Sequence, residues 1–522
     1  MLEYYLTGAG LRLAQVVIHA SLWIVIGCFV AAIFRRMLGP EKVRKIFANN
    51  TRWGLLVGWL MGMLLPVCSL GVIPVVREMH RAGVSRGTIV AFGLTAPLFN
   101  PMSVLYGLTL SDPIAIISFS FCALIVVSFV GFIWNRWLTG SLPEAKGADE
   151  PMPTIGLRRS ASVLYTTAKE IAGPAMIFIL IGILGSVLTA AFFEKGLLQN
   201  QVERDNWMAP IVVALIGTPV YSTPLLAMSQ IGSMFQHGNS VGAAFSLLIL
   251  GAGANLGLLA WFAYTYGFRR FIAFFLLLSS ITVGLAYIVD KPLYPKGVDP
   301  AGHTHAFDVY THPFKYGESN LTDLALTKLD DFWRTNEYGG TYVLAALLVI
   351  GLGLLAISQR FDFEAWFQSG TYEKTKFDRI IPGWFIGMVA VTGLVISSIV
   401  GCYVYYPDAD DLLSDLTIVN TECVIAAKTK QWEAAEKWIQ YSDDLSRRLE
   451  VGVYLRKGSV SEFQTAKAKV YREKLDTLRH AVEDQDASNI NRQAMDVAKA
   501  YLRMSEAFRT RDKVGFPPKS DE

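Results

Sequence analysis

The sequence PVCSLGVIP at residues 66–74 has a counterpart, PVYSTP, at residues 219–224. Downstream of both stretches, the same residue types recur with a constant spacing of 155 positions. The matched pairs are Gly83 with Gly238, Ser85 with Ser240, Gly87 with Gly242, and Asn100 with Asn255. A fixed spacing over several pairs indicates an internal duplication. We therefore interpret the two stretches as equivalent parts of two similar halves.

The composition indicates a membrane protein. Hydrophobic residues make up 52% of the 522 positions and charged residues 17%, against roughly 45–50% and about 25% in soluble domains. A helix needs about 20 apolar residues to cross a bilayer. Runs of that length begin at Leu11, Pro113, Ile171, Val241, Phe271, Tyr342 and Ile380. Since residues 408–522 hold none, we predict an all-α polytopic membrane protein with a polar C-terminal domain.

Charge, cysteines and motifs exclude several other classes of protein. The formal net charge of +3 is too small to indicate nucleic-acid binding. The five cysteines form no CxxC pair and no zinc-finger spacing, so neither a disulfide framework nor a structural zinc site is indicated. A GxSxG pattern occurs at 83–87 and 238–242, but each copy opens a membrane span, whereas a hydrolase elbow follows a strand. No GxxxxGK[ST] loop is present, and we expect no enzyme.

Basic residues set the orientation of the first half. The loop after the first span is rich in arginine and lysine, and the linker at 138–170 carries Lys146, Arg158 and Arg159, which predicts that both are cytoplasmic. Three apolar segments lie between them, and three full crossings would put the loops on opposite sides. A re-entrant hairpin over Trp53–Met79 removes the conflict, because Pro66, Gly71 and Pro74 would interrupt its helix.

The second half repeats this pattern in the opposite orientation. A hairpin is predicted over Trp207–Phe235, interrupted at Gly217, Pro219 and Pro224, and it enters from outside. Two halves of opposite orientation, each with a broken re-entrant hairpin, form the inverted-repeat plan of many secondary transporters.

The predicted organisation has six parts. They are membrane repeat 1 (1–137), a cytoplasmic linker (138–170), membrane repeat 2 (171–290), an external His-rich loop (291–340), two additional membrane spans (341–405) and an external helical domain (406–522). In the last part the sequence predicts a helix break at Gly458 and a capping box from Ser459 to Glu462. We expect three or four helices there.

The interrupted helices form the predicted binding site. In hydrocarbon, unpaired backbone groups must be buried in protein or line a polar cavity, and such breaks bind ions and small polar solutes. The alternative is that the small residues only allow close helix packing, but packing alone would not call for paired breaks in paired hairpins. The candidate residues are Pro66, Cys68, Ser69, Gly71, Pro97, Asn100, Pro219, Tyr221, Ser222, Thr223, Gly251, Gly253 and Asn255.

The first half resembles a known family. The residues that carry the resemblance are Pro66, Cys68, Ser69 and Pro74, a glycine-containing turn, and the segment 91–100. They are similar to the bacterial predicted-permease family that includes trivalent organoarsenical efflux permeases, and the resemblance covers roughly residues 10–290. It implies an inner-membrane permease whose hairpin motif lies on the transport path. Many family members have a second cysteine where this chain has Leu70, and a lone thiolate is a weaker ligand set for a metalloid than a pair.

The predicted external loop offers a second site. Three of the seven histidines fall within ten residues. Imidazoles and a carboxylate at such spacing can bind a transition-metal ion such as zinc, copper or nickel, and the alternative is a polar loop with incidental histidines. The candidate ligands are His303, His305, Asp308 and His312. We expect no other cofactor.

Two functions remain open on this basis. The favoured one is a multi-pass inner-membrane permease that moves a small solute or ion, for example a metal, metalloid or sulfur compound, through the site at the two hairpin breaks. The other is a membrane-anchored metal-binding sensor or scaffold that acts through the His-rich loop and the C-terminal domain. The lipid bilayer and a small solute are the expected partners in the first case.

Overall fold

The computed structural model builds the described part of the chain from helices, and every regular element in that part is a helix. It describes residues 1–47, 53–65, 67–138, 157–295, 298, 300, 304–335, 339–358, 360–369 and 383–509. The chain divides into two compact units. Unit 1 comprises Met1–Val104 and Ser111–Gly383, and unit 2 comprises Leu105–Leu110 and Trp384–Glu522. Each unit is described by itself.

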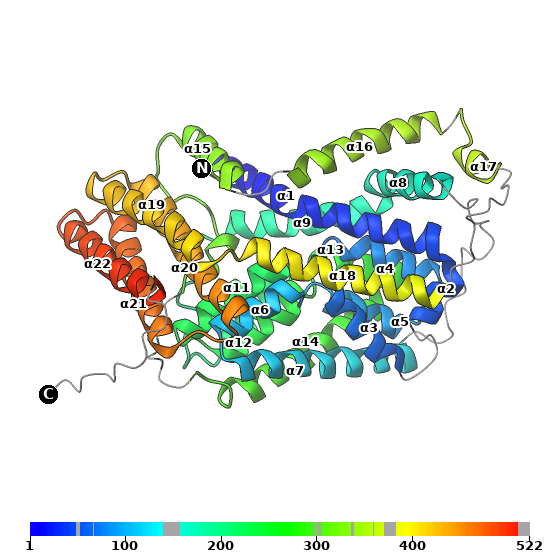
Figure 1. Ribbon diagram of the computed structural model, residues 1–522. Coiled ribbons are helices and arrows are strands. Elements are labelled where there is room, and N and C mark those ends of the chain that lie inside the picture. The colour runs from blue at the N-terminus through cyan, green and yellow to red at the C-terminus, as the bar shows by residue number, and fades with distance from the viewer. Residues whose placement is uncertain are drawn as a thin grey trace. The chain divides into compact units, whose positions relative to one another are not determined.

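Unit 1 holds most of the helices, which Figure 1 labels in chain order. The first half has α1 (Leu2–Ile33), η1 (Phe34–Leu38), α2 (Gly39–Ile46), α3 (Trp53–Leu64), α4 (Val72–Arg81), α5 (Arg86–Thr95), the start of α6 (Pro101–Leu110), α7 (Pro113–Ile133) and η2 (Trp134–Leu138). The second half has α8 (Leu157–Ile171), α9 (Pro174–Phe192), α10 (Ala209–Gly217), α11 (Pro224–Gln236), α12 (Val241–Ser246), η3 (Leu247–Ala252), α13 (Leu256–Tyr266) and α14 (Phe268–Asp290). The rest has η4 (Asp308–Tyr310), α15 (Leu321–Thr335), α16 (Gly339–Ile357) and α17 (Phe363–Gln368).

Several of these helices are long and apolar enough to cross a membrane. Five qualify among the described residues, and a sixth is counted if the bent pair Val241–Ala252 and Leu256–Tyr266 is one span. The five are Leu2–Ile46, Pro113–Arg136, Ala175–Phe192, Phe268–Asp290 and Gly339–Ile357. They coincide with the apolar runs in the sequence, and the protein is an all-α polytopic membrane protein.

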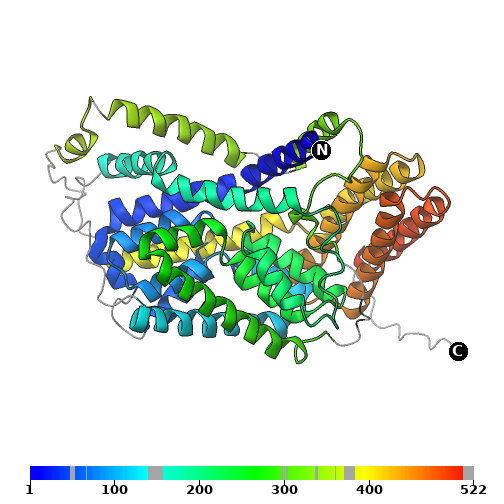
Figure 2. The same cartoon turned by 180° about the vertical axis from the view of Figure 1, so that it is seen from behind.

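Two pairs of short helices are separated by segments that contain the predicted break residues Gly71 and Pro219, whereas Pro74, Gly217 and Pro224 lie within helices. Leu65 and residues 67–71 lie between α3 and α4, and residues 218–223 lie between α10 and α11. Near one end of α7 lie α3, α4 and α5, whereas α11 and α12 lie near its other end (Figure 1). The view from behind keeps this order (Figure 2). The two broken pairs therefore lie toward opposite ends of unit 1.

Each broken pair ends in the same glycine turn. Gly83 and Gly238 have φ values of +77° and +62°, which favour glycine because it lacks a Cβ. Val84 N donates to Met79 O at 3.0 Å, and the equivalent bond, from Asn239 N to Met234 O, lies 155 positions later at 2.9 Å. In each turn the glycine N–H also donates to the carbonyl three residues earlier. These paired bonds form a Schellman motif, which explains why glycine occupies both positions.

The next helix of each half packs closely on the last span of that half. A Cβ on Gly87 would lie 2.3 Å from Gly131 O, and a Cβ on Gly242 would lie 2.6 Å from Ala286 O. Both partners are again 155 positions apart. The glycines of the two GxSxG patterns thus serve turns and close helix packing, as expected when no hydrolase is present.

A side chain at the end of each last span fixes this packing. Gly87 N donates to Asn135 Oδ1 at 2.7 Å, and Gly242 N donates to Asp290 Oδ1 at 2.7 Å. Asn135 and Asp290 are also 155 positions apart. Asp290 additionally accepts a hydrogen bond from the Ser240 hydroxyl at 2.8 Å.

Unit 2 contains one long apolar helix and four further helices around their own core. The helices are α18 (Gly383–Tyr405), α19 (Ala409–Lys428), α20 (Trp432–Lys457), α21 (Glu462–Glu483) and α22 (Ile490–Arg509). Leu416, Leu449, Tyr471, Leu475 and Val497 belong to the buried core of the last four. A buried ion pair, Arg472 with Glu450 at 2.6 Å, lies in this unit.

The structure corrects one detail of this region. The predicted break is present, because Gly458 ends α20 with φ +75°. The predicted capping box from Ser459 to Glu462 is wrong. The box is formed by Ser461 and Gln464, whose side chain and backbone bond each other reciprocally, so α21 begins two residues later than the pattern suggested.

Candidate functional site

The two non-helical segments meet inside unit 1. We call residues 67–71 the first tip and residues 219–223 the second tip. The Ser69 hydroxyl of the first tip donates to the carbonyl oxygen of Ser222 in the second tip at 3.3 Å. Both serines are fully buried. Two segments that are 153 positions apart in the sequence therefore form one site.

The first tip is held close to α1. A Cβ on Gly71 would lie 2.3 Å from Trp23 O, and a Cβ on Gly27 would lie 1.9 Å from Gly71 O. Only glycine fits this crossing. The backbone turn places Gly71 N 3.3 Å from the sulfur of Cys68, which accepts its hydrogen bond. Pro66, the other candidate of this tip, lies outside the described residues.

The second tip is held by α9 and by its own cap. Tyr221 N donates to the Ser186 hydroxyl of α9, and a Cβ on Gly185 would lie 2.3 Å from Pro219 O. The Thr223 hydroxyl oxygen accepts from Leu226 N at 3.1 Å and caps α11. The second tip is thereby fixed on both sides of Tyr221.

The side chain of Tyr221 faces the first tip. Its hydroxyl interacts with the thiol of Cys68, and both residues are buried. That contact falls outside standard hydrogen-bond geometry, and within the described part of the chain the Tyr221 hydroxyl has no partner of that geometry. The thiol of Cys68 and the phenol of Tyr221 therefore face each other where the tips meet, and both can form further hydrogen bonds.

Each half contains a second interruption, which follows the glycine turn and the next helix. In the first half residues 96–100 separate α5 from α6, and in the second half Gly253 to Asn255 separate η3 from α13, with a bend of 57°. Asn100 Oδ1 accepts from Ser103 N at 2.7 Å, and Asn255 Oδ1 accepts from Leu258 N at 2.9 Å. Both bonds cap the following half-helix.

Asn255 also joins this second interruption to the first tip. Its side-chain amide donates to the carbonyl oxygen of Ser69. Gly253 allows the approach of neighbouring backbone, since a Cβ on it would lie 2.9 Å from Leu94 O, whereas a Cβ on Gly251 would lie 2.9 Å from the side chain of Leu247. Pro97 is buried within the interruption of the first half. The structure thus brings Cys68, Ser69, Tyr221, Ser222 and Asn255 together, whereas Pro97, Asn100 and Gly251 support the surrounding backbone.

The electrostatics of the site come from the backbone, because neither tip contains a charged residue. Four half-helices begin at the interruptions, with first residues Val72, Pro101, Pro224 and Leu256. The N-terminal end of a helix carries a partial positive charge. Such ends favour electron-rich atoms of a bound solute.

Two further residues, Tyr310 and Gln230, lie beside this site and were not predicted from the sequence. Tyr310 from η4 is buried, and its hydroxyl donates to Gln230 Oε1 of α11 at 3.1 Å. It also interacts with the hydroxyl of Ser222 and with Tyr221. Tyr310 lies in the predicted loop, outside the duplicated halves. The signal that could have found it is the aromatic content of residues 304–314, which is unusual for a solvent-exposed loop.

The predicted loop ligands do not form a metal centre of their own. His303 lies outside the described residues. His305 Nδ1 lies 2.7 Å from Asp308 Oδ2. His312 is buried instead against Tyr4, where its two ring nitrogens bond the backbone of Phe314 and Tyr4. Taken by itself, the described part of unit 1 holds no cluster of three His, Cys, Asp or Glu side chains close enough to share one ion.

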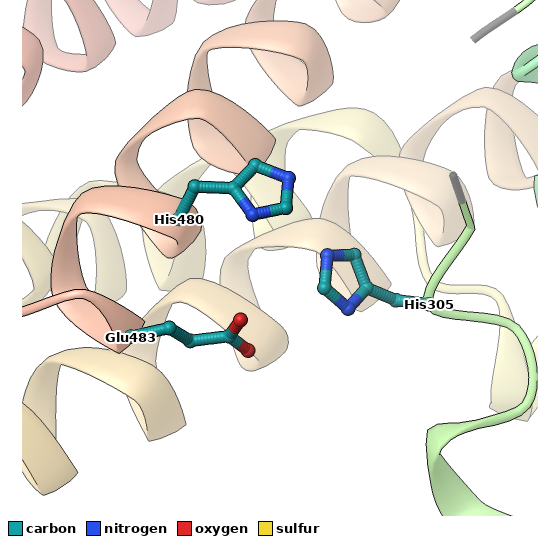
Figure 3. Close-up of side chains that lie close together, drawn as sticks. All are labelled: His305, His480 and Glu483. Carbon is teal, nitrogen blue, oxygen red and sulfur yellow. The ribbon is translucent and has the colours of Figure 1, made fainter. Parts of the chain in front are cut away.

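A separate pair of titratable groups lies in unit 2. His480 and Glu483 project from the last turn of α21 (Figure 3). A hydrogen bond to Asp476 raises the pKa of His480 above its usual value. Figure 3 also labels His305, a residue of unit 1.

Comparisons with known proteins agree with the helical membrane architecture. The model of a family described as "Predicted permease" matches residues 8–291, more than half of the chain. The UPF0718 protein YcgR of Bacillus subtilis (strain 168) is 36% identical over 88 residues, which are 17% of this chain and 30% of that protein. A putative two-component membrane permease complex subunit of Streptococcus mutans serotype c (strain ATCC 700610 / UA159) is 29% identical over 88 residues, which are 17% of this chain and 29% of that protein.

The matched stretch therefore spans about a third of the length of these two curated relatives. No solved structure matches the chain.

Proposed function

This chain belongs to the predicted permease family, and we propose that it carries a small solute or ion across the membrane through the site where its two tips meet. The observation that carries the proposal is the joining of two interrupted helices deep in unit 1, by the bond from Ser69 to Ser222 and by the bond from Asn255 to Ser69. Interrupted helices at membrane depth are tolerated only where they are buried in protein or line a polar path. The buried thiol of Cys68 and hydroxyl of Tyr221 then lie on that path.

We infer that the two halves are inverted repeats. Equivalent contacts at a spacing of 155 positions support this inference: the turns at Gly83 and Gly238, the acceptors Asn135 and Asp290, and the caps of Asn100 and Asn255. The location of the broken pairs toward opposite ends of unit 1 agrees with opposite orientations (Figure 1). Inverted repeats give a transporter two similar access routes to one central site.

The topology follows from the basic loops. We propose that the loop after the first span and the linker at 138–170 are cytoplasmic, because the first is rich in arginine and lysine and the second carries Lys146, Arg158 and Arg159. This orientation places the His-rich loop (291–340) and the helical domain (406–522) outside a cell inner membrane. In this proposal the halves are 1–137 and 171–290, and residues 341–405 add two spans.

The groups at the tips indicate the kind of solute. Cys68, Tyr221 and Ser222 are uncharged hydrogen-bonding groups, and no carboxylate lies in either tip. Hard divalent cations need several carboxylate or carbonyl oxygens, so the tips suit a soft or polar solute such as a metalloid or sulfur compound. Leu70 is packed against Gly182 of α9. Because residue 70 is leucine, no second thiol follows Ser69. The proposal therefore does not include a pair of cysteines that binds an arsenical.

A transport screen tests the proposal. Metals, metalloids and sulfur compounds are offered to cells with and without the protein, and accumulation is compared among variants that reach the membrane in equal amount. We expect Cys68→Ala and Tyr221→Phe to lower the transport rate of the active compound at least tenfold. The matched control is Cys122→Ala, which changes a half-buried cysteine of α7 away from the tips. Normal rates in both tip variants would contradict the assignment of the site.

A further inference from the structure

A side chain from outside the two halves reaches the site between them. Tyr310 is 3% exposed, and its hydroxyl lies beside Ser222 of the second tip. We propose that Tyr310 contacts the solute and caps the site on the side of residues 304–314. This inference rests on the proposed function, because it assumes that the tips form the transport site. The cap lies outside residues 8–291, which match the family model.

The hydrogen bonds of Tyr310 show how the cap is aimed. Gln230 is 3% exposed, and its side-chain amide donates to Ala306 O at 2.7 Å. This bond turns Gln230 Oε1 toward Tyr310, whose hydroxyl donates to it at 3.1 Å. The phenol is therefore held beside Ser222 by α11, the helix that follows the second tip. Opening the cap requires the loss of this bond.

The segment that carries the cap is anchored at several points. Arg12 of α1 donates to Asp308 O at 2.8 Å and to Thr311 O at 2.9 Å, on either side of Tyr310. The Gln199 side chain donates to Asp308 Oδ1 at 3.0 Å. These bonds hold the single 3₁₀ turn in place, so the phenol alone can swing while its backbone stays attached.

The chemistry of the cap matches that of the tips. The Tyr221 hydroxyl lies beside the thiol of Cys68, and the Tyr310 hydroxyl lies beside that of Ser222 and interacts with Tyr221. Each hydroxyl both donates and accepts a hydrogen bond. When the bond to Gln230 is exchanged for a bond to a solute, the phenol can donate to an acceptor atom of that solute. Solute binding and cap movement are then coupled through one hydroxyl group.

Access to Cys68 tests the cap without knowledge of the solute. The full chain is studied in membrane vesicles, and a positively charged, membrane-impermeant methanethiosulfonate reagent is added on either side. Labelling of Cys68 is followed by peptide mass, with Cys68→Ser as the blank. We expect slow labelling in the wild type, since Cys68 is fully buried. Tyr310→Ala should label at least tenfold faster, and only from the side of residues 304–314.

Two further variants complete the test. Gln230→Ala removes the acceptor but keeps the phenol, and it should give a smaller acceleration in the same direction. Tyr316→Ala is the matched control, because it changes another tyrosine of the same region that is 67% exposed, and it should label like the wild type. Unchanged labelling in both Tyr310→Ala and Gln230→Ala would overturn the cap. If Tyr310→Ala does not fold, Gln230→Ala decides alone.

The outcome is separable from that of the proposed function. Faster labelling of Cys68 without transport of any compound would support the cap and contradict the permease. Transport that depends on Cys68, together with unchanged labelling in the cap variants, would contradict the cap and leave the permease in place.

Discussion

The Ser69 hydroxyl donates to the carbonyl oxygen of Ser222 at 3.3 Å, which links the two tips directly. Backbone carbonyls in an interruption between helices lie outside the hydrogen-bond pattern of either helix, and the hydrocarbon of a membrane offers no water in place of the missing partner. The first tip therefore stabilises the interruption in the second half, and Asn255 of the second half bonds the Ser69 carbonyl of the first tip. A substitution in one tip should therefore lower the stability of both halves of the protein.

Asn255→Ala should destabilise the site more than the equivalent change in the first half. The substitution removes the cap on Leu258 N and the donor to Ser69 O. Loss of a cap costs about 1 kcal/mol, and an unsatisfied buried carbonyl adds about 1–3 kcal/mol. The thermal unfolding midpoint of the purified chain should fall clearly. In Asn100→Ala, which removes the cap on Ser103 N, the fall should be smaller, and equal falls would contradict this account.

Asp290 should tolerate the residue that its counterpart carries. Asp290→Ala removes the acceptor of Gly242 N and of the Ser240 hydroxyl, at about 2 kcal/mol for two hydrogen bonds. Asp290→Asn restores the amide oxygen that Asn135 uses in the first half, so its midpoint should lie near that of the wild type. A low midpoint in both variants would show that the charge itself is needed.

Gly87→Ala and Gly242→Ala should each reduce the amount of folded protein in the membrane. The new Cβ would lie 2.3 Å or 2.6 Å from a backbone carbonyl oxygen, and such overpacking costs about 1–3 kcal/mol or more. Gly284→Ala is the matched control, since no atom lies within 4 Å of its Cβ. Fluorescence-detected size exclusion measures the folded fraction. Equal fractions in all three variants would contradict the close packing.

His312 should make the stability of its region depend on pH. Burial lowers the pKa of His312 below its usual value of about 6.5, and the ring is stacked on Tyr4 with centroids 3.6 Å apart. The charged groups that influence it are Arg12 and Glu318. Because the folded state prefers the neutral ring, the stability is complete above about pH 6.5 and is lost as the pH falls through the lowered pKa.

The measurement for His312 compares unfolding midpoints at pH 7.5 and at pH 5.5. The wild type should lose more stability on acidification than His312→Gln, which cannot take up a proton. An identical loss in the two proteins would assign the pH effect to other groups.

Arg472 and Glu450 should behave as a buried ion pair of unit 2. Their side chains are 6% and 1% exposed and lie 2.6 Å apart. Arg472→Ala leaves a buried carboxylate without this partner and should cost about 3–5 kcal/mol. The double variant Glu450→Leu with Arg472→Met should recover most of that loss. The test is the rate of proteolysis within residues 406–509, and no recovery in the double variant would contradict the expectation.

The sequence predicted the framework of unit 1 because identical residues mark it. Gly83 and Gly238 are the same residue since only glycine suits the left-handed turn that both halves require. The acceptors Asn135 and Asp290 escaped notice because an amide and a carboxylate offer the same oxygen to a backbone N–H while differing in residue type. The residue type can therefore differ between the two halves while the hydrogen bond stays the same.

The sequence was less informative about residues 304–314. Clustered histidines indicated a metal site, but packing against Tyr4 uses both ring nitrogens of His312. Tyr310 belongs to the same segment, and its contact with the second tip depends on tertiary structure that the aromatic content of the segment does not specify. Tyr310 is outside the duplicated halves in the sequence, and tertiary packing brings it to their site.

The duplicated contacts also have an evolutionary consequence. The turns at Gly83 and Gly238 and the helix crossings at Gly87 and Gly242 use backbone atoms and residues other than Cys68 and Tyr221. Mutations at these two positions can therefore accumulate without loss of the scaffold. A few codon changes at these two positions could alter what the site binds while the scaffold stays folded.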